Sequence, residues 1–406
     1  MSAWPITELA SAARTLRRVS FGAADATFDR RPGSIPCLTT AAVKSEPKWD
    51  TARYIPARLV NDEQLLRPGD ILVSTSNSAE IVGRSCIVSS VPETATFGAF
   101  VTVVRPDANV FDARFLALWM RSHAYLKAIA RLKTRTTNIS NIRTSDLGRL
   151  MVPLPPLDEQ RRITARLREQ LAQVDRIREG VNQQVRGLKA LVASTIRTAI
   201  GVEFETVRAI ELGSIAEVQL GKMMSPAARR GERALPYLRN ANVQWDRFDL
   251  SDVGLMDFTV AEEAKFVLRP DDVLVCEGGE PGRAAVWAGQ IVRCGYQKAL
   301  HRIRPLPARL DPQFLVYRLW LGALDGEFAD SQAATTIAHL PAVRLKDLKL
   351  ALPSFGEQRR IAARLRERLA EIDQAKAALE AQRKAIDALP AALLREVFGP
   401  AKLLDR

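Results

Sequence analysis

An eleven-residue segment occurs twice in this chain and constrains its fold more than any other feature. Glu159–Glu169 reads EQRRITARLRE and Glu357–Glu367 reads EQRRIAARLRE, so ten of the eleven positions are identical at an offset of 198 residues. Each copy follows an apolar segment bounded by proline, Val152–Leu157 in the first case and Leu350–Pro353 in the second. A repeat at this separation indicates two copies of one unit, each a globular domain followed by a helix.

Further matching segments extend the repeat towards the N-terminus of each copy. Leu66–Val73 (LRPGDILV) aligns with Leu268–Val275 (LRPDDVLV), and Gly83 with Gly282. The Pro-Gly or Pro-Asp pair predicts a turn, and the apolar run after it predicts a strand. Because the offset changes along the chain, we expect the loops of the two copies to differ in length.

The residues between these anchors predict an α+β fold, in which one mixed α/β domain of roughly 150 residues occurs twice. Gly, Pro, Asn and Asp separate short predicted strands: Ile71–Ser74, Cys86–Val88, Phe100–Val104, Val273–Cys276, Ala284–Trp287 and Ala299–Ile303. A helix with an apolar face is predicted near Ala113–Leu132 and near Pro312–Phe328. We place the domains at residues 1–152 and 201–352, followed by long helices at 153–200 and 353–399.

Apolar residues recur with 4-3 spacing along both long helices, in the same register of the repeat. This heptad pattern predicts a coiled coil. Its proposed seam consists of Ile163, Leu167, Val174, Ile177, Val181, Leu188, Ile361, Leu365, Ile372, Leu379 and Ile386. Ser354 and Glu357 have the capping-box spacing, which places the start of the second helix there. Pro390 is expected to end or kink that helix.

The simplest partner for one apolar stripe is the other stripe in the same chain. Two equivalent repeats related by a pseudo-two-fold axis would make the helices antiparallel. A helix of roughly 40 residues is about 60 Å long, which exceeds one DNA turn of about 34–36 Å. We therefore expect the helix pair to act as a spacer between two domains. The alternative is that each helix packs on its own domain, and the sustained heptads favour the spacer.

The charge balance indicates the class of partner. The formal net charge is +13 at pH 7, which favours a polyanion, with nucleic acid ahead of a membrane surface. The alternative is an ordinary solvated surface of an arginine-rich protein. With no apolar run long enough to cross a bilayer and no cleavable leader, the sequence predicts a cytoplasmic protein. The four cysteines include no C-x-x-C pair and predict isolated thiols.

The sequence carries no recognisable catalytic motif. A methyltransferase would need an N/D-P-P-Y/F tetrapeptide, but the Pro155-Pro156 pair lies within LPPL. The G-x-x-x-x-G-K-S/T phosphate loop is also absent. The glycine-rich segment Gly278–Arg283 predicts a tight turn, because no helix follows it. Without a constellation for nucleophilic chemistry or a metal site, we expect no enzyme activity and no cofactor in this chain.

Polar and basic side chains suited to base edges and phosphates remain as candidates for DNA binding. In the second repeat, Tyr237–Trp245 offers Arg, Asn and Gln, which can make bidentate contacts to guanine or adenine. For any single residue, an ordinary surface or turn position is the alternative. The candidates are Lys44, Lys48, Ser76, Asn77, Arg84, Lys133, Arg135, Thr137, Asn138, Lys222, Arg229, Arg230, Arg239, Asn240, Asn242, Gln244, Arg283, Gln297 and Lys298.

Taken together, these features resemble the specificity subunit of type I restriction–modification systems. The resemblance rests on the LRPG/DDI/VLV and Gly-Arg turns and on PLPPLxEQRRI opening a long helix, twice in one chain. It covers the chain from about Ile6 to Phe398. Tyr237–Trp245 and Tyr296–Leu300 are similar to this family's target-recognition domains.

The resemblance implies that each domain reads one half of a bipartite double-stranded DNA sequence. The helices would set the gap between the halves and dock two modification subunits. Those subunits would bind S-adenosylmethionine and methylate adenine, and separate restriction subunits would supply translocation and cleavage with ATP and magnesium. The first repeat departs from the pattern, because Cys37–Ala42 replaces the Arg-Asn-x-Asn string. This difference predicts that the two half-sites differ.

Three other functions remain open at this point. One is the recognition subunit of a related system, in which a single partner chain both cleaves and methylates. Another is a scaffold whose coiled coil joins proteins and whose basic charge is incidental. A third is an enzyme whose polar pocket leaves no motif in the sequence.

Overall fold

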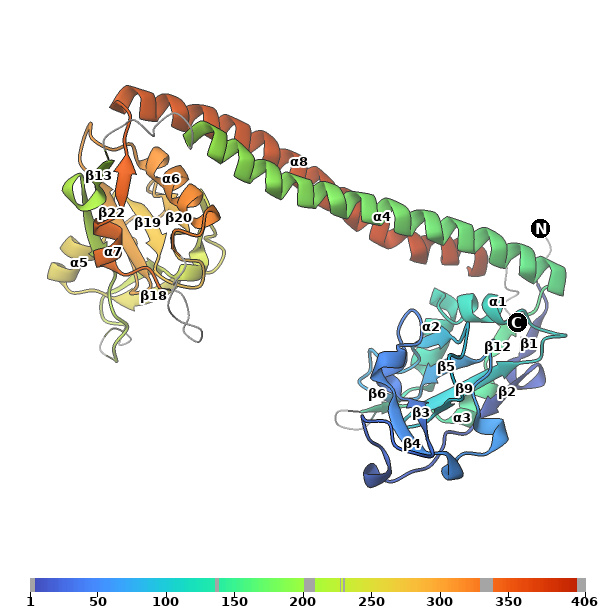
Figure 1. Cartoon of the computed structure of the whole chain (residues 1–406). Coiled ribbons are helices and arrows are strands. Elements are labelled where there is room, and N and C mark those ends of the chain that lie inside the picture. The colour runs from blue at the N-terminus through green and yellow to red at the C-terminus, as the bar shows by residue number, and fades with distance from the viewer. Residues whose placement is uncertain are drawn as a thin grey trace. The chain divides into compact units, whose positions relative to one another are not determined.

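The computed structural model describes residues 4–135, 139–200, 209–226, 228, 231–328 and 339–399. The chain divides into two compact units, which we call unit 1 (residues 1–181 and 381–406) and unit 2 (residues 182–380). The long helices α4 (Leu157–Ile200) and α8 (Phe355–Phe398) each contribute one part to unit 1 and one part to unit 2 (Figure 1).

Unit 1 is built on a four-stranded antiparallel sheet with the order β2-β9-β5-β7. Its strands are β2 (Ala13–Leu16), β9 (Val101–Pro106), β5 (Ile71–Ser74) and β7 (Ser85–Ile87). A second sheet has the order β4-β3-β8, with β4 (Arg53–Pro56), β3 (Ser34–Leu38) and β8 (Thr96–Phe97). Smaller sheets join β1 (Ile6–Glu8) to β12 (Met151–Pro153), and β10 (Thr134–Arg135) to β11 (Ser140–Asn141) and β6 (Ser76–Asn77).

Unit 2 repeats this sheet order with the second set of strands. Its four-stranded sheet has the order β14-β22-β19-β20, with β14 (Ala216–Leu220), β22 (Leu300–Pro305), β19 (Val273–Cys276) and β20 (Ala284–Val286). The sheet β18-β15-β21 consists of β18 (Gly254–Asp257), β15 (Ala234–Leu238) and β21 (Gly295–Tyr296). Two further pairs join β13 (Ala209–Glu211) to β23 (Lys349–Ala351) and β16 (Val243–Gln244) to β17 (Arg247–Phe248). The predicted strands are confirmed to within two residues at each end.

The repeated LRP-x-D segment ends in an aspartate that ties its turn to the central sheet. In unit 1, the buried Asp70 carboxylate accepts hydrogen bonds from Nε and Nη2 of Arg105 at 2.7 and 2.8 Å. In unit 2, Asp272 accepts from Nε and Nη2 of Arg304 at 2.6 and 2.7 Å. Each aspartate also accepts from the backbone N–H three residues earlier. The motif therefore repeats because it closes the same turn onto the same strand in each unit.

Short helices cover the central sheets, and one of them differs from the prediction. The single helix expected near Ala113–Leu132 is wrong, because Ser122 separates α1 (Ala113–Trp119) from α2 (His123–Leu132). The Ser122 hydroxyl accepts from the backbone N–H of Tyr125 at 3.3 Å and so starts a new helix. The remaining helices are α3 (Thr144–Gly148), α5 (Val260–Phe266), α6 (Pro312–Leu324) and α7 (Ala342–Lys346).

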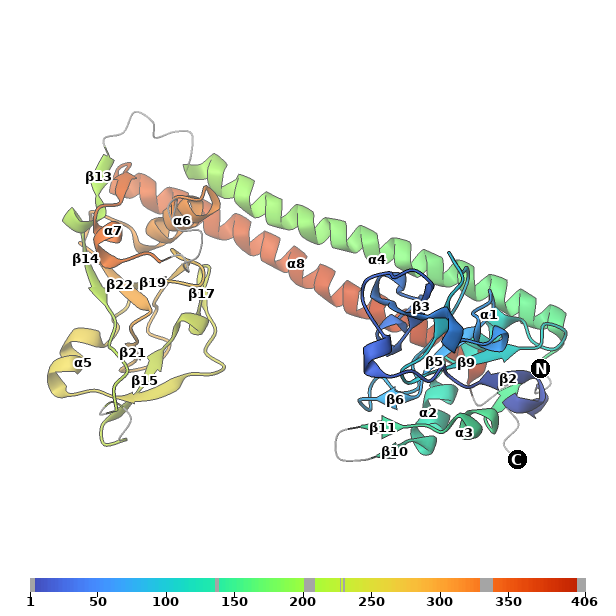
Figure 2. The same ribbon diagram turned by 60° about the horizontal axis from the view of Figure 1, so that its bottom comes forward.

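The two long helices run antiparallel within each unit. In unit 1, the end of α8 packs on the start of α4, since Leu394 and Phe398 share a core with Ile163 and Leu167. In unit 2, Ile196 and Ile200 at the end of α4 share a core with Ile361 and Leu365 at the start of α8. Figures 1 and 2 show the helices side by side within each unit.

The boundaries of α8 test two predictions. The helix begins immediately after Ser354, whose hydroxyl accepts from the backbone N–H of Glu357 at 3.3 Å. The predicted cap is confirmed. The helix does not end at Pro390 but continues as one helix to Phe398. Packing of its last turn into the core of unit 1 stabilises the continuation and offsets the hydrogen bond that proline cannot donate.

Candidate nucleic-acid interface

The Arg-Asn-x-Asn string of unit 2 forms a tight turn, η9 (Asn240–Asn242), that its own side chains hold together. The Asn242 side chain is only 3 % exposed. Its Oδ1 accepts from the backbone N–H of Arg239 at 2.8 Å, and its Nδ2 donates to the carbonyls of Asp249 and Asp252, both at 2.9 Å. This geometry does not fit the base contact expected of Asn242, because the amide is buried and its bonds are made within the loop.

The neighbouring side chains are also engaged in the protein. Arg239 Nη2 donates to the carboxylate of Asp252 at 2.7 Å, and this bond raises the pKa of Arg239. Asn240 Nδ2 donates to the carbonyl of Gly278 at 2.7 Å, and Arg283 Nη2 donates to the carbonyl of Asn240 at 3.1 Å. The structure thus brings Arg239, Asn240 and Arg283 together, with much of their donor capacity committed to shaping the turn.

The remaining unit 2 candidates divide by exposure. Lys222 is largely buried, with its Nζ 2.5 Å from Glu262 Oε2, and this contact lowers the pKa of Glu262. A paired, buried lysine of this kind does not fit a phosphate contact. Gln244 and Gln297 are half-buried and Lys298 is exposed, so these three remain open to a ligand.

In unit 1, the candidates gather around the turn η3 (Thr40–Ala42), which corresponds to η9. Asn77 Nδ2 donates to the hydroxyl of Thr40 at 3.3 Å and ties β6 to this turn. Lys133 Nζ donates to the carbonyl of Ala79 at 2.6 Å, in the loop after β6. Lys44 and Arg84 line one shared pocket. The structure therefore brings together polar groups that lie far apart in the sequence.

The other unit 1 candidates contribute less. Ser76 lies beside Asn77 in β6 and is half-buried, and Lys48 is exposed beyond η3. Several candidates lie outside the described residues, namely Thr137, Asn138, Arg229, Arg230 and the side chain of Arg135.

Sequence reasoning missed three side chains beside these turns. Trp245 and Trp320 of unit 2 stack in parallel with their ring centroids 5.0 Å apart. Arg121 of unit 1 lines the pocket with Lys44 and Arg84. Two of these residues occupy equivalent positions in the repeat, because Arg121 and Trp320 each lie nine residues after a helix N-cap, Asp112 and Asp311 respectively. An alignment of the two repeats position by position would therefore have shown an arginine in one unit where the other has a tryptophan.

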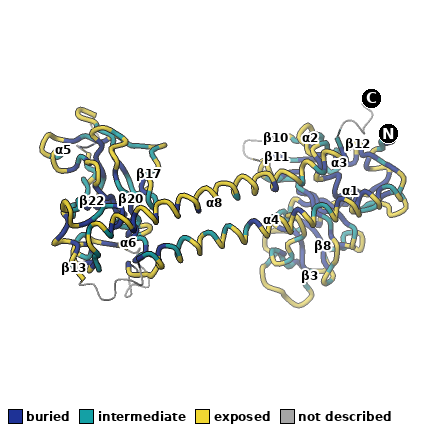
Figure 3. Tube along the Cα trace, turned by 90° about the horizontal axis from the view of Figure 1, so that it is seen from above, coloured by how far each residue is buried: buried dark blue, intermediate teal, exposed yellow. Residues whose placement is uncertain are grey.

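Most of the predicted coiled-coil seam is buried. Leu188 and Leu379 are half-buried, and Ile177 is 43 % exposed, contrary to the seam prediction. At the level of Ile177, the contact between the helices is instead polar, with Arg178 Nε donating to Asp387 Oδ1 at 2.8 Å. The alternation of buried and exposed positions along the helices is visible in Figure 3. The buried seam residues are Ile163, Leu167, Val174, Val181, Ile361, Leu365, Ile372 and Ile386.

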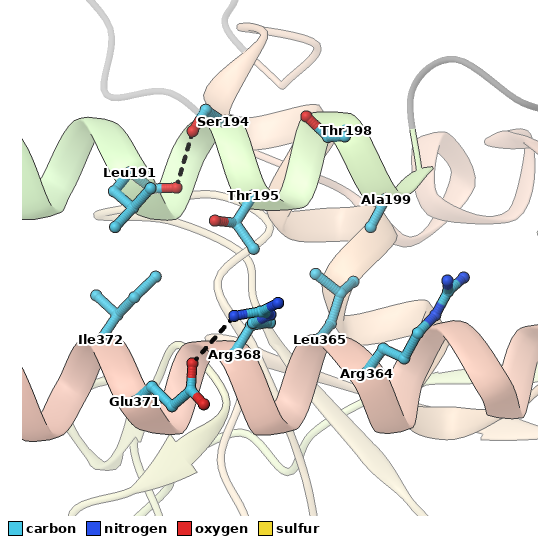
Figure 4. Close-up of a pocket in the computed structure, with 10 residues that line it drawn as sticks. All are labelled: Leu191, Ser194, Thr195, Thr198, Ala199, Arg364, Leu365, Arg368, Glu371 and Ile372. Carbon is cyan, nitrogen blue, oxygen red and sulfur yellow. Dashed lines mark hydrogen bonds and ion pairs between the residues drawn. The ribbon is translucent and has the colours of Figure 1, made fainter.

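A groove of about 640 Å³ lies between α4 and α8 in unit 2 (Figure 4). Ala199 lies opposite Leu365, and Thr195 lies opposite Arg368, which pairs with Glu371 at 3.4 Å on the α8 side. Arg364 lines the same side. In the repeat, the positions of Thr195 and Ala199 correspond to Leu393 and Val397, which pack into the core of unit 1. The smaller side chains of α4 therefore leave a groove in unit 2, whereas the larger side chains of α8 fill the equivalent space in unit 1.

The cysteines are buried thiols. Burial raises the pKa of Cys37 and Cys294 to about 12 and that of Cys86 and Cys276 to about 11. Within the described part of the chain, no cluster of histidine, cysteine and acidic residues could hold a metal ion. Over the same residues, no helix is long and apolar enough to span a membrane.

Comparison with known proteins shows which family this chain resembles. Residues 30–186 match the model of the type I restriction modification DNA specificity domain. The chain is 23 % identical to the EcoKI specificity subunit of Escherichia coli K12, over 91 % of this chain and 83 % of that protein. It is also 23 % identical to the StySPI specificity subunit of Salmonella potsdam, over 97 % and 88 % of the two chains. Residues 30–186 thus match a type I restriction–modification specificity domain, and nearly the whole chain is similar to specificity subunits of such systems.

Two solved structures share the fold of this chain. A chain from a study of complex assembly and conformational transition in the type I R-M system superposes with a TM-score of 0.78, at 19 % identity over 99 % of this chain and 98 % of that one. The HsdS subunit of Thermoanaerobacter tengcongensis superposes with a TM-score of 0.62, at 20 % identity over 99 % and 97 %. The family resemblance and the two-domain fold expected from the repeated motifs are confirmed.

Proposed function

We propose that this chain is a type I specificity subunit that reads a split target in double-stranded DNA, with one half-site recognised by each unit. The observation that carries the proposal is the relation between the units. They share their sheet order and the Asp–Arg anchor, but the side chains around η3 and η9 differ. A common framework with different polar surfaces is what two readers of different base sequences require.

The charge of the chain supports DNA as the ligand. A net charge of +13 favours binding to the phosphate backbone. Half-buried or exposed groups such as Gln244, Gln297 and Lys298 remain able to contact bases or phosphates. The buried amide of Asn242 contributes by shaping the turn rather than by contacting a base.

We further propose that α4 and α8 serve two purposes, as a spacer between the half-sites and as the docking surface for the modification subunits. The open groove at Thr195 and Ala199 supports docking, because its apolar side chains suit an amphipathic segment of such a subunit, and Arg364 adds a cation beside the Arg368–Glu371 pair. Catalysis then belongs to the partners. The modification subunits would use S-adenosylmethionine to methylate adenine, and restriction subunits would use ATP and magnesium for translocation and cleavage.

Methylation mapping tests this function. The gene would be expressed with that of its modification subunit, and methyl-adenine would be located across the genome. We expect a split motif with a methylated adenine in each half and a fixed gap between the halves. Exchanging one unit for that of another specificity subunit should change the sequence of one half only. A continuous motif would show that only one unit reads DNA. Absence of methylation dependent on this chain, with the modification subunit still bound, would favour a protein-joining scaffold.

A further inference from the structure

A basic pocket of about 350 Å³ lies in unit 1 beside η3. Three cationic side chains line it from separate segments: Lys44 after η3, Arg84 before β7, and Arg121 between α1 and α2. Lys44 and Arg121 are exposed and Arg84 is half-buried. In the part of the chain that the structure describes, none of these three side chains has an ion-pair or hydrogen-bond partner. An exposed carboxylate, Glu46, lies nearby.

The backbone around this pocket is held rigidly. Gly83 has a φ of +89°, and a Cβ at that position would lie 2.4 Å from Cγ2 of Ile129. The buried Tyr125 hydroxyl donates to the carbonyl of Gly83 at 2.9 Å. The Ser85 hydroxyl donates to the carbonyl of Met120 at 3.2 Å. These contacts fix the segments that carry Arg84 and Arg121 to each other, so the backbone positions of the two arginines are set before a ligand binds.

Unit 2 has a pocket of about 270 Å³ at the corresponding place, but its chemistry is different. Trp245 stands where unit 1 has Ser45, and Trp320 stands where unit 1 has Arg121. A carboxylate, Glu280, accepts from Nε1 of Trp245 at 2.7 Å.

The arginine of unit 2 that corresponds to Arg84 does not line this second pocket, and it is paired with a carboxylate. Arg283 corresponds to Arg84, and its Nη1 donates to Glu280 Oε2 at 3.1 Å. The shared fold therefore does not require a cluster of free cations here, because unit 2 forms the same framework with aromatic rings and a neutralised arginine.

We propose that the unit 1 pocket holds a phosphodiester group of the DNA backbone, and that unit 2 makes no equivalent phosphate contact. This inference rests on the proposed DNA-reading function. Two guanidinium groups and an ammonium group supply charge and donors that match phosphate oxygens. The unit 2 pocket disfavours the same group, since a phosphate there would approach the Glu280 carboxylate. Arg121 is accordingly a positioning residue, which sets the register of unit 1 on the duplex without reading sequence.

The test uses the complex of this chain with its modification subunits and a duplex that carries the mapped target. Arg121→Gln removes one cation from the pocket, and Arg58→Gln removes an exposed arginine of unit 1 that lies outside it. Affinity is measured as a function of salt concentration. Arg121→Gln should reduce the magnitude of the negative slope of log K against log salt by about one and weaken binding about fivefold at 0.15 M salt, through the loss of one phosphate contact. Arg58→Gln should change neither quantity.

Neutral methylphosphonate linkages, introduced one at a time, locate the phosphate. One such linkage in the half-site of unit 1 should weaken DNA binding by the unaltered complex. On that duplex, the unaltered complex and the Arg121→Gln complex should bind with equal affinity. The corresponding linkage in the other half-site should have no such effect. Arg84→Gln provides an independent variant if Arg121→Gln unfolds early.

The outcomes separate the two proposals. Specific binding and methylation by the unaltered complex, with an unchanged salt slope in Arg121→Gln and Arg84→Gln, would overturn the phosphate pocket alone. A changed base preference in Arg121→Gln would overturn it in favour of a base contact. Absence of specific DNA binding by the unaltered complex would instead refute the underlying function.

Discussion

Gln160 and Gln358, which are 198 residues apart, make the same three hydrogen bonds at the starts of α4 and α8. Gln160 Oε1 accepts from the backbone N–H of Asp112 at 2.9 Å, and its Nε2 donates to the carbonyls of Val110 and Pro155 at 3.0 and 2.9 Å. Gln358 makes the equivalent bonds in unit 2 at 2.9, 3.2 and 3.0 Å. Both side chains are almost completely buried. The glutamine of the repeated motif therefore fastens each long helix to its own domain.

Replacing Gln358 by alanine should destabilise unit 2. The change leaves one backbone N–H and two carbonyls without their partner in a part-buried environment, which costs roughly 1–3 kcal/mol in the free energy of unfolding. Urea unfolding of the full chain, followed by far-UV circular dichroism, measures the effect. Arg359→Ala is the matched control, because it changes the neighbouring, exposed residue of the same motif. Equal midpoints for the two variants would show that the glutamine does not anchor the helix.

Asn242 and Gln244 lie two residues apart and should respond differently to substitution by alanine. Asn242→Ala removes a buried side chain that donates two hydrogen bonds and accepts one, and it should lower the unfolding midpoint of unit 2. Gln244→Ala removes a half-buried side chain bonded to the carbonyl of Ala241 at 3.0 Å and should leave the midpoint unchanged. Its effect should appear as altered base preference at one half-site. A stable Asn242→Ala protein with altered base preference would reverse this assignment.

The cysteine thiols should be unreactive in the folded protein at pH 8. Each pKa is raised by burial to about 11 or 12, so the nucleophilic thiolate is scarce at pH 8 and becomes abundant only as the pH rises through those values. A chromogenic disulfide reagent should react slowly with the native chain and rapidly with all four cysteines in denaturant. Rapid native labelling of Cys86 or Cys276 would reveal an opening of the sheet that carries it.

Shortening the long helices should change the gap in the recognised DNA sequence. Removing one heptad from the middle of both α4 and α8 preserves the seam and shortens each helix by about 10 Å, which corresponds to about three base pairs. Methylation mapping should then show the same two half-sites with a smaller gap. An unchanged gap would exclude the helices as the spacer. As a control for impaired docking of the modification subunits, seven residues of one helix are replaced by a scrambled sequence of the same length.

Local patterns predicted the elements whose formation depends on nearby residues. The Pro-Gly turn before Ile71–Ser74 and the cap at Ser354 both act within a few residues, so the strand and the helix start could be read directly. The break at Ser122 was missed, although serine is a common helix cap, because the apolar stripe appeared continuous. The continuation of α8 beyond Pro390 depends on distant packing against unit 1, which no local pattern records.

The sequence by itself determined the repeat, the two-domain α+β organisation, the long helices and, through its motifs, the family resemblance. These features follow from residue spacing and periodicity, which can be read without knowing the tertiary contacts. Only the tertiary structure decided which polar side chains face solvent. Asn242 is buried by a loop that returns ten residues later, while Lys44, Arg84 and Arg121 meet because separate segments pack together. Exposure and proximity depend on chain segments far apart in sequence, so the candidate interface required the fold to be in place.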